Sequence, residues 1–238
     1  MVFILSCLFI FVVSGTTISY IINAREDSVV KAVDNFVEES KEETSVKQKH
    51  MKGVIVIDPG HGGYDPGSDF DGVYEKDVVL SVAKYMGAYL EKNDYRVVYT
   101  RDKDVSVGDY EIKDLQNRVD IASANQADLF VSLHLNFSEL VSQRAYGFDT
   151  YANEGVGESM NYANNIMQEL SKLNYSQARY AQNGDTLHVV KKNERPAVLV
   201  EMGFVSDSSD LAYLRKDAGQ KAIGEAIAKA VIDTKQEK

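Results

Sequence analysis

Short apolar runs alternate with helical stripes from Met51 onward. The expected strands are rich in β-branched or aromatic residues and comprise Val54 to Asp58, Arg96 to Thr100, Leu129 to His134, Tyr146 to Tyr151, Thr186 to Val190 and Ala197 to Met202. Apolar residues at helical spacing lie between several of them, as in the sets Val79, Val82, Ala83, Met86, Leu90; Met160, Ala163, Ile166, Met167, Leu170, Leu173; and Ile223, Ile227, Ala230, Val231. Nearly apolar strands that alternate with helices predict a three-layer α/β domain, whose sheet is covered on both faces.

The N-terminal part of the chain follows a different pattern. Residues 2–22 contain no charged side chain, and a helix of that length at ~1.5 Å per residue spans a hydrocarbon core of about 30 Å. We therefore expect residues 1–24 to be a membrane segment. We favour a retained anchor over a cleaved signal, because no basic region precedes the apolar run. Residues 25–50 are dense in both signs of charge and predict a juxtamembrane linker, which leaves 51–238 as the folded domain.

Charge and cysteine content narrow the chemistry. The 238-residue chain has 26 basic and 36 acidic residues, a net charge of -10, which disfavours nucleic acid as a partner. The single cysteine, Cys7, lies in the N-terminal apolar run and permits neither an intrachain disulfide nor a thiolate zinc site. Any metal in this protein must therefore be held by imidazole and carboxylate groups.

Polar side chains follow three of the expected strands at their carboxyl ends. His61 comes just past the first strand, in "VIVIDPGHGGYDPGS" (54–68), His134 ends another strand and Glu201 lies near the end of a third. Ligand sites of open α/β sheets lie at this edge. The glycines at 60, 62 and 63 permit positive φ, so we expect a tight turn around the His61 imidazole.

These residues allow two interpretations. His61 and His134, together with Glu75 in "VYEKDVVL", form a His-Glu-His set that suits a hydrolytic zinc site with a fourth position open to water. Alternatively, the two histidines satisfy backbone groups in turns, Glu75 lies in a helix's first turn and Glu201 pairs with Arg101 or Arg195. The sequence contains no GxSxG nucleophile motif, dinucleotide fingerprint or P-loop.

Five separated motifs together resemble a known family. In chain order they are "VIVIDPGHGGYDPGS", "VYEKDVVLSVAKYMGAYLE", "YRVVYTRDKD", "DLQNRVDIASANQADLFVSLHLNFS" and "RPAVLVEMGFVSD". This set resembles the zinc-dependent N-acetylmuramoyl-L-alanine amidases (amidase family 3) of bacterial cell-wall turnover, over residues 54 to about 232. The resemblance implies a twisted, mixed, mostly parallel sheet of about six strands flanked by helices.

The resemblance also implies a site. His61, Glu75 and His134 match the ligands of one Zn²⁺ per chain, and Glu201 matches the catalytic glutamate, which takes a proton from the attacking water. The implied reaction is hydrolysis of the amide bond between N-acetylmuramic acid and L-alanine in peptidoglycan. Asp58 and Asp65 are candidates to orient an imidazole.

Three positions depart from the family pattern, and a fourth has an open role. Leu135 and Phe137 flank Asn136 where the family has smaller residues, and His188 stands where an aromatic residue is common. None of these changes touches an implied ligand. Asn136 is expected either to contact substrate or to brace its loop.

Partners and location follow from the same reasoning. We expect peptidoglycan as substrate, membrane attachment through the N-terminal segment, a monomeric catalytic domain and no nucleic-acid partner. The catalytic domain is expected outside the cytoplasmic membrane, or secreted if residues 1–24 are cleaved. Two other functions stay open on these residues, namely a non-catalytic peptidoglycan-binding or regulatory protein on the same fold and a zinc peptidase acting within the stem peptide.

Overall fold

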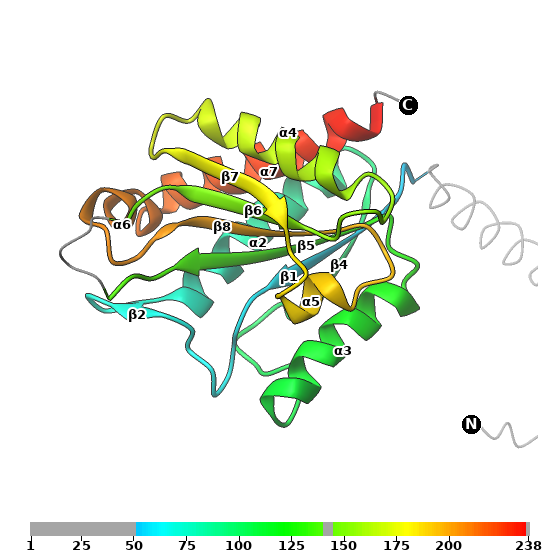
Figure 1. The fold of residues 1–238 in the computed structure, drawn as a ribbon, viewed down its shortest axis with the longest axis horizontal. Helices are drawn as coiled ribbons and strands as arrows, with labels where there is room; N and C mark the ends of the chain where they lie inside the picture. The colour runs from blue at the N-terminus through cyan, green and yellow to red at the C-terminus, as the bar shows by residue number, and fades with distance from the viewer. Residues whose placement is uncertain (1–50, 140–144, 237–238) are drawn as a thin grey trace, which may run out of the picture. The chain divides into compact units, whose positions relative to one another are not determined.

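One six-stranded sheet lies at the centre of the computed structural model, which describes residues 51–139 and 145–236 (Figure 1). Its strand order is β4-β1-β5-β8-β6-β7. The strands are β1 (Val54–Pro59), β4 (Arg96–Tyr99), β5 (Leu129–Asn136), β6 (Phe148–Ala152), β7 (Ala178–Asn183) and β8 (Ala197–Phe204). The short strands β2 (Asp69–Phe70) and β3 (Val73–Tyr74) form a separate antiparallel pair.

The sheet is mixed and mostly parallel, as the sequence predicts. β1 pairs in parallel with β4 and β5, β5 with β8, and β6 with β7, whereas β6 runs antiparallel to β8. Four neighbouring strands, β4, β1, β5 and β8, therefore end at the same edge. Their loops and last residues are the parts of the sheet that can converge on one site.

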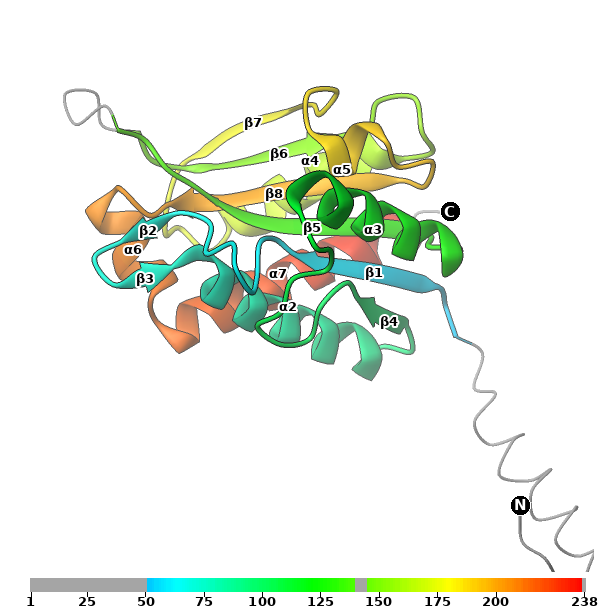
Figure 2. The ribbon, with the colours of Figure 1, turned by 90° about the horizontal axis from the view of Figure 1, so that it is seen from below.

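The two faces of the sheet are covered differently. The helices are α2 (Glu75–Lys92), α3 (Glu111–Ala124), α4 (Ser159–Ser171), α5 (His188–Lys191), α6 (Ser208–Leu214) and α7 (Asp217–Gln236). The predicted apolar stripes of α2, α4 and α7 pack against one face and form the larger core with it. α3 and the short α5 form a second core on the opposite face (Figure 2).

The face under α3 and α5 changes character along the strands. Near the strand beginnings it is apolar, with Val56 in register beside Phe130. Two residues further along, on the same face, come the buried polar pair Asp58 and Ser132. His134 follows, in register with Glu201 of β8. α3 and α5 thus seal the apolar half, while the polar half lies at the carboxyl edge.

One predicted strand is wrong, and one observed strand was not predicted. The segment from Thr186 to Val190 does not form a strand, because the chain turns at Gly184 and then enters the helical turn α5. Val189 and Val190 pack in the second core from this helical turn. The sixth strand is instead β7, an edge strand whose side chains are mostly exposed. Edge strands need not carry the apolar pattern that marks a central strand.

The predicted membrane segment, 1–24, and the linker, 25–50, lie outside the described residues. Among the helices of residues 51–139 and 145–236, none is both long and apolar enough to cross a membrane.

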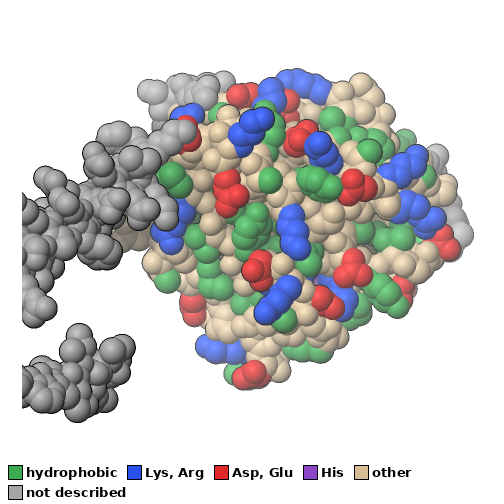
Figure 3. All heavy atoms as spheres, turned by 180° about the vertical axis from the view of Figure 1, so that it is seen from behind, with side chains coloured by type: hydrophobic (Ala, Val, Ile, Leu, Met, Phe, Trp, Pro, Cys, Tyr) green, Lys and Arg blue, Asp and Glu red, His purple; other side chains and the backbone are tan. Residues whose placement is uncertain are grey.

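Acidic and basic side chains are interspersed on the face seen in Figure 3.

The crossing of α2 and α7 has room for a glycine only. A Cβ atom at Gly224 would lie 2.7 Å from the Val82 carbonyl oxygen and 2.9 Å from the Met86 nitrogen, both in α2. Helix propensity alone would make Gly224→Ala stabilising by about 1 kcal/mol. Because the contact is with backbone, we predict instead that unfolding in urea shows a loss of about 1–3 kcal/mol.

The matched control is Lys221→Ala on the exposed side of the same helix. This variant should change the free energy of unfolding by no more than about 0.5 kcal/mol. A Gly224→Ala protein as stable as wild type would contradict the packing described for these two helices.

Candidate metal centre

Four separate elements bring the predicted site residues to the carboxyl edge of the sheet. His61 lies in the loop after β1, Glu75 is the first residue of α2, His134 is in β5 and Glu201 is in β8. His61, Glu75 and His134 each offer one ligating atom, and these atoms all lie within 4.8 Å of one another. Residues as far apart as 61 and 134 in sequence therefore share one point in space.

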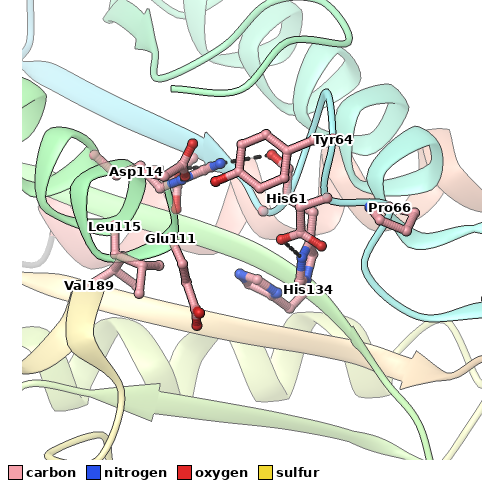
Figure 4. Close-up of a pocket in the computed structure, with 12 residues that line it drawn as sticks. His61, Tyr64, Pro66, Glu111, Asp114, Leu115, His134 and Val189 are labelled. Atoms are coloured by element: carbon pink, nitrogen blue, oxygen red, sulfur yellow. Dashed lines mark hydrogen bonds and ion pairs between the residues drawn. The ribbon is translucent and has the colours of Figure 1, made fainter. Parts of the chain in front are cut away.

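Two imidazole nitrogens face the same carboxylate oxygen. His61 Nε2 lies 3.2 Å and His134 Nδ1 lies 3.1 Å from Glu75 Oε1. The two rings are 4.8 Å apart between centroids and nearly perpendicular, and Figure 4 shows them side by side at the cavity wall. Two imidazoles and one carboxylate form a donor set of the His₂Glu kind found at hydrolytic zinc sites, which leave a fourth position open. The residues present therefore fit a zinc ion.

A second layer of hydrogen bonds orients these ligands. Asp65 Oδ2 lies 2.7 Å from His61 Nδ1, which leaves Nε2 directed at Glu75. Glu75 is held from both sides, because the Leu135 N–H donates to Oε1 at 2.8 Å and the Ser68 hydroxyl donates to Oε2 at 2.7 Å. Such contacts fix ring orientation and ligand basicity at metal sites. Of the two predicted orienting aspartates, Asp65 contacts a histidine.

Asp58 has a different part. It is fully buried and accepts hydrogen bonds from Thr100, Ser132 and the Arg118 guanidinium. Among residues 51–139 and 145–236, none of its hydrogen-bond partners is an imidazole. Asp58 therefore joins β1 to β5 and to α3 beneath the site.

The glycine-rich loop turns tightly, although not as the sequence predicts. Gly62 and Gly63 have φ of 120° and 60°, as expected, but Gly60 does not have positive φ and His61 does, at 60°. Gly60 is required for space, because a Cβ atom there would lie 2.3 Å from Cε1 of the His134 ring. The loop backbone thus passes directly against the His134 ring and brings the His61 imidazole edge-to-face with it.

Glu201 lies beside the triad of His61, Glu75 and His134, and one of its oxygens has no hydrogen-bond partner in the part of the chain that the structure describes. It is in register with His134 on one side and with Asp149 of β6 on the other, so all three side chains face the same way. Its Oε2 is buried, and among the described residues nothing hydrogen-bonds to it. Burial is the main reason that the pKa of Glu201 is raised to about 7; His134 opposes the shift and Glu75 and Asp149 reinforce it.

The pKa values of Glu75 and His61 both shift in the direction that favours the charged form of the side chain. Burial acts to raise the pKa of Glu75, but hydrogen bonds and charge attraction from His134 and His61 outweigh it and hold that pKa well below its usual range. Burial acts to lower the pKa of His61, but Glu75 and Asp65 raise it to about 9. The arrangement favours positive charge at this point, as a cation site requires.

Glu75 does more than occupy the first turn of a helix, and Glu201 has neither of the two expected arginine partners among the described residues. Glu75 does stand in the first turn of α2, but its carboxylate faces the two histidines. Arg101 donates to backbone carbonyls and Arg195 to the Ala127 carbonyl, so neither is an ion-pair partner of Glu201 among the described residues.

The remaining positions lie around the site rather than in it. His188 begins α5, where its Nε2 lies 3.2 Å from Gln116 Oε1. Phe137 is 43% exposed and packs against Phe70 of β2 with ring centroids 6.3 Å apart. The Asn136 backbone pairs with β8.

A cavity of about 510 Å³ opens from the two histidines towards α3. Asp65 and Pro66 border it near the imidazoles, and Tyr64, Glu111, Leu115 and Val189 form its other walls (Figure 4). Its volume and its mixture of carboxylate, phenol and aliphatic groups suit a polar ligand larger than water.

Three further side chains support the site, and the sequence points to neither Ser68 nor Arg118 in this role and to Arg101 only as an alternative partner of Glu201. Ser68 binds Glu75, while Arg101 and Arg118 bind the carbonyls of the His61 loop. Arg118 did leave a signal, since it interrupts the apolar stripe formed by Leu115, Val119 and Ala122 on α3. A buried charge in such a stripe indicates a specific partner.

Comparison with known proteins identifies relatives along most of the folded part. The family model described as N-acetylmuramoyl-L-alanine amidase matches residues 55–233. The germination-specific N-acetylmuramoyl-L-alanine amidase of Bacillus subtilis is 30% identical over 187 residues, covering 75% of this chain and 78% of that protein. The uncharacterized protein YqiI of the same organism is 35% identical over 180 residues, covering 75% and 82%.

Solved structures agree with this result. The amidase AmiC2 of Nostoc punctiforme is 32% identical, with a TM-score of 0.70 and coverage of 78% of this chain and 98% of that one. The CwlD amidase of Clostridioides difficile, solved in complex with the GerS lipoprotein, is 28% identical with a TM-score of 0.73, covering 78% and 100%.

Burial of Glu201 should make the metal-free protein less stable as pH rises. At pH values between the usual glutamate pKa of 4.5 and the pKa of about 7 that Glu201 has in the folded state, the folded protein keeps a proton that the unfolded protein releases. Stability from this group therefore falls across that window, and above pH 7 the folded protein bears the full cost of a buried carboxylate. We predict that metal-free Glu201→Gln is more stable than wild type at pH 8 by about 1–3 kcal/mol.

Urea unfolding of both metal-free proteins at several pH values measures this difference. The gap should close below about pH 4.5, where both states of the wild type are protonated. Glu111→Gln, on the exposed wall of the cavity, is the matched control and should show little difference at either pH. A Glu201→Gln protein no more stable than wild type at pH 8 would mean that Glu201 is well solvated.

Proposed function

The chain belongs to the N-acetylmuramoyl-L-alanine amidase family, and we propose that it cleaves the bond between N-acetylmuramic acid and L-alanine. In this proposal His61, Glu75 and His134 hold one zinc ion, and Glu201 is the general base. The observation that carries the proposal is the meeting of these three ligating groups beside a glutamate that has one buried carboxylate oxygen. A zinc ion bound there supplies a water molecule of lowered pKa and polarises a carbonyl group.

Glu201 is suited to move the proton in this reaction. A carboxylate with a pKa of about 7 is a strong enough base to take a proton near neutral pH, and its conjugate acid can release it again. Glu201 accepts one proton from the water that attacks the amide carbon, and then delivers it to the alanine nitrogen as the C–N bond breaks. Its buried Oε2 has no hydrogen-bond partner within the described residues and is free for this work.

Three neighbouring groups hold the proposed ligands in place. Asp65 accepts a hydrogen bond from His61 and stabilises the orientation in which Nε2 faces inward. Ser68 and the Leu135 amide hold the Glu75 carboxylate so that one oxygen stays between the two imidazoles. The 510 Å³ cavity beyond them offers space for the substrate on the side of Tyr64 and Glu111.

Location and assembly are part of the same proposal. Peptidoglycan lies outside the cytoplasmic membrane, so residues 1–24 would anchor an extracytoplasmic catalytic domain through the linker 25–50. An extended linker at up to ~3.3 Å per residue reaches tens of ångströms into the wall. The catalytic domain would work as a monomer.

The extracytoplasmic location is tested by adding protease to cells freed of their wall. Degradation of the catalytic domain supports this location, and full protection contradicts it.

The products of muropeptide digestion test the reaction. We expect wild-type protein to release intact stem peptides from purified muropeptides, as measured by mass spectrometry. Glu201→Gln should lower the rate by at least about 10²-fold while zinc content stays at the wild-type level, because the base is not a ligand. Shorter peptide fragments would indicate a zinc peptidase, and no release by the wild type would indicate a binding protein.

The metal ligands are tested by histidine variants. His61→Ala and His134→Ala should each lose zinc, measured as metal per chain after gel filtration, and should lose hydrolysis with it. His188→Ala is the matched control, since this histidine lies outside the triad and should keep its zinc. Stoichiometric zinc in His134→Ala would remove that residue from the ligand set.

A further inference from the structure

Two buried arginines bind the backbone of the loop that carries His61. Arg101 and Arg118 are 3% and 2% exposed, and together they donate to the carbonyl oxygens of Pro59, Gly60 and His61. We propose that Arg101 and Arg118 are positioning residues for the metal site, which fix the His61 loop relative to the elements that carry Glu75 and His134. This inference rests on the proposed function, because it assumes that the triad binds zinc.

Arg101 connects the loop to the helix of the second ligand. Its Nε donates to the Pro59 carbonyl at 3.0 Å, and its Nη2 donates to the Gly60 and Lys76 carbonyls at 2.8 Å each. Lys76 follows Glu75 in the first turn of α2. One planar guanidinium thus spans the two chain segments that carry His61 and Glu75, and its rigid fork fixes their separation.

Arg118 connects the same loop to the strand of the third ligand. Its Nη2 donates to the His61 carbonyl at 2.7 Å, and its Nη1 donates to Asp58 Oδ1 at 2.7 Å. The other oxygen of Asp58 accepts the Ser132 hydroxyl at 2.7 Å, and Ser132 lies two residues before His134 in β5. The path from Arg118 through Asp58 therefore ends beside the third ligand.

The loop needs such support because of its backbone. His61 has φ of 60°, a conformation that is strained for a non-glycine residue and persists only where surrounding contacts determine it. The glycines on either side contribute little rigidity of their own. Three consecutive carbonyls held by two guanidiniums provide this constraint from outside the loop.

Arg101 is also an unusual way to stabilise a fold. Its donors all meet backbone carbonyls, and among the described residues it forms no ion pair with a carboxylate. A buried guanidinium loses its hydration, and this loss offsets much of what its hydrogen bonds contribute to stability. Its distinctive effect is therefore geometric, on the distance between the segments that it joins.

The test replaces each arginine by lysine, which keeps the charge but cannot span several carbonyls with a planar fork. For Arg101→Lys and Arg118→Lys we expect the zinc dissociation constant, measured by competition with a chromophoric chelator, to rise by at least about tenfold. The visible spectrum of bound Co²⁺, which reports coordination geometry, should change as well. Arg195→Lys is the matched control, because Arg195 also binds a backbone carbonyl but far from the triad, and it should match wild type.

Each outcome decides the matter. A purely structural role would lower the melting temperature of the metal-free protein and leave both the zinc affinity of the folded protein and the Co²⁺ spectrum unchanged, which would overturn the inference. If Arg118→Lys fails to fold because its pairs with Asp58 and Asp114 are disturbed, Arg101→Lys decides alone. Wild-type protein that binds no zinc would instead overturn the proposed function, and the inference would fall with it.

Discussion

The meeting of two imidazole nitrogens on one carboxylate oxygen is the interaction on which the account depends. Glu75 Oε1 lies 3.2 Å from His61 Nε2 and 3.1 Å from His134 Nδ1, and it also accepts the Leu135 amide. Such crowding is stable only with positive charge at that point, supplied either by protons or by a metal ion. The position of Glu75 at the start of α2 adds the positive end of a helix dipole. The same features that stabilise the carboxylate suit it to bind a cation.

The architecture explains why the site lies where it does. The larger core, closed by α2, α4 and α7, contains most of the buried apolar side chains of the described residues. On the opposite face, α3 and α5 seal the apolar half and Arg118 of α3 binds the buried Asp58, while His134 and Glu201 lie nearer the carboxyl edge. Glu201 departs from the rule that buried polar atoms are hydrogen-bonded, since its buried Oε2 has no partner among the described residues. That departure is expected where a group must exchange protons with a ligand.

Much of this could be predicted from the sequence, for identifiable reasons. Central strands such as β5 and β8 are nearly continuous apolar runs, and polar residues at their ends stand out against them. The edge strand β7 carries no such contrast, and α5 is a β-branched segment whose helical turn is set by its packing against the sheet. Tertiary contacts decide both cases. The choice of Asp65 over Asp58 as the partner of His61 depends on the turn of the loop, and residue types alone do not determine this turn.

X-ray absorption spectroscopy at the zinc edge, on protein loaded with one equivalent of zinc, tests the central claim most directly. The account predicts a shell of nitrogen and oxygen neighbours at about 2.0–2.1 Å, with the outer-shell scattering of two imidazole rings. A sulfur neighbour is not expected, because the only cysteine lies in the N-terminal apolar run. A spectrum without imidazole scattering, or with an oxygen-only shell like that of hydrated zinc, would contradict the account.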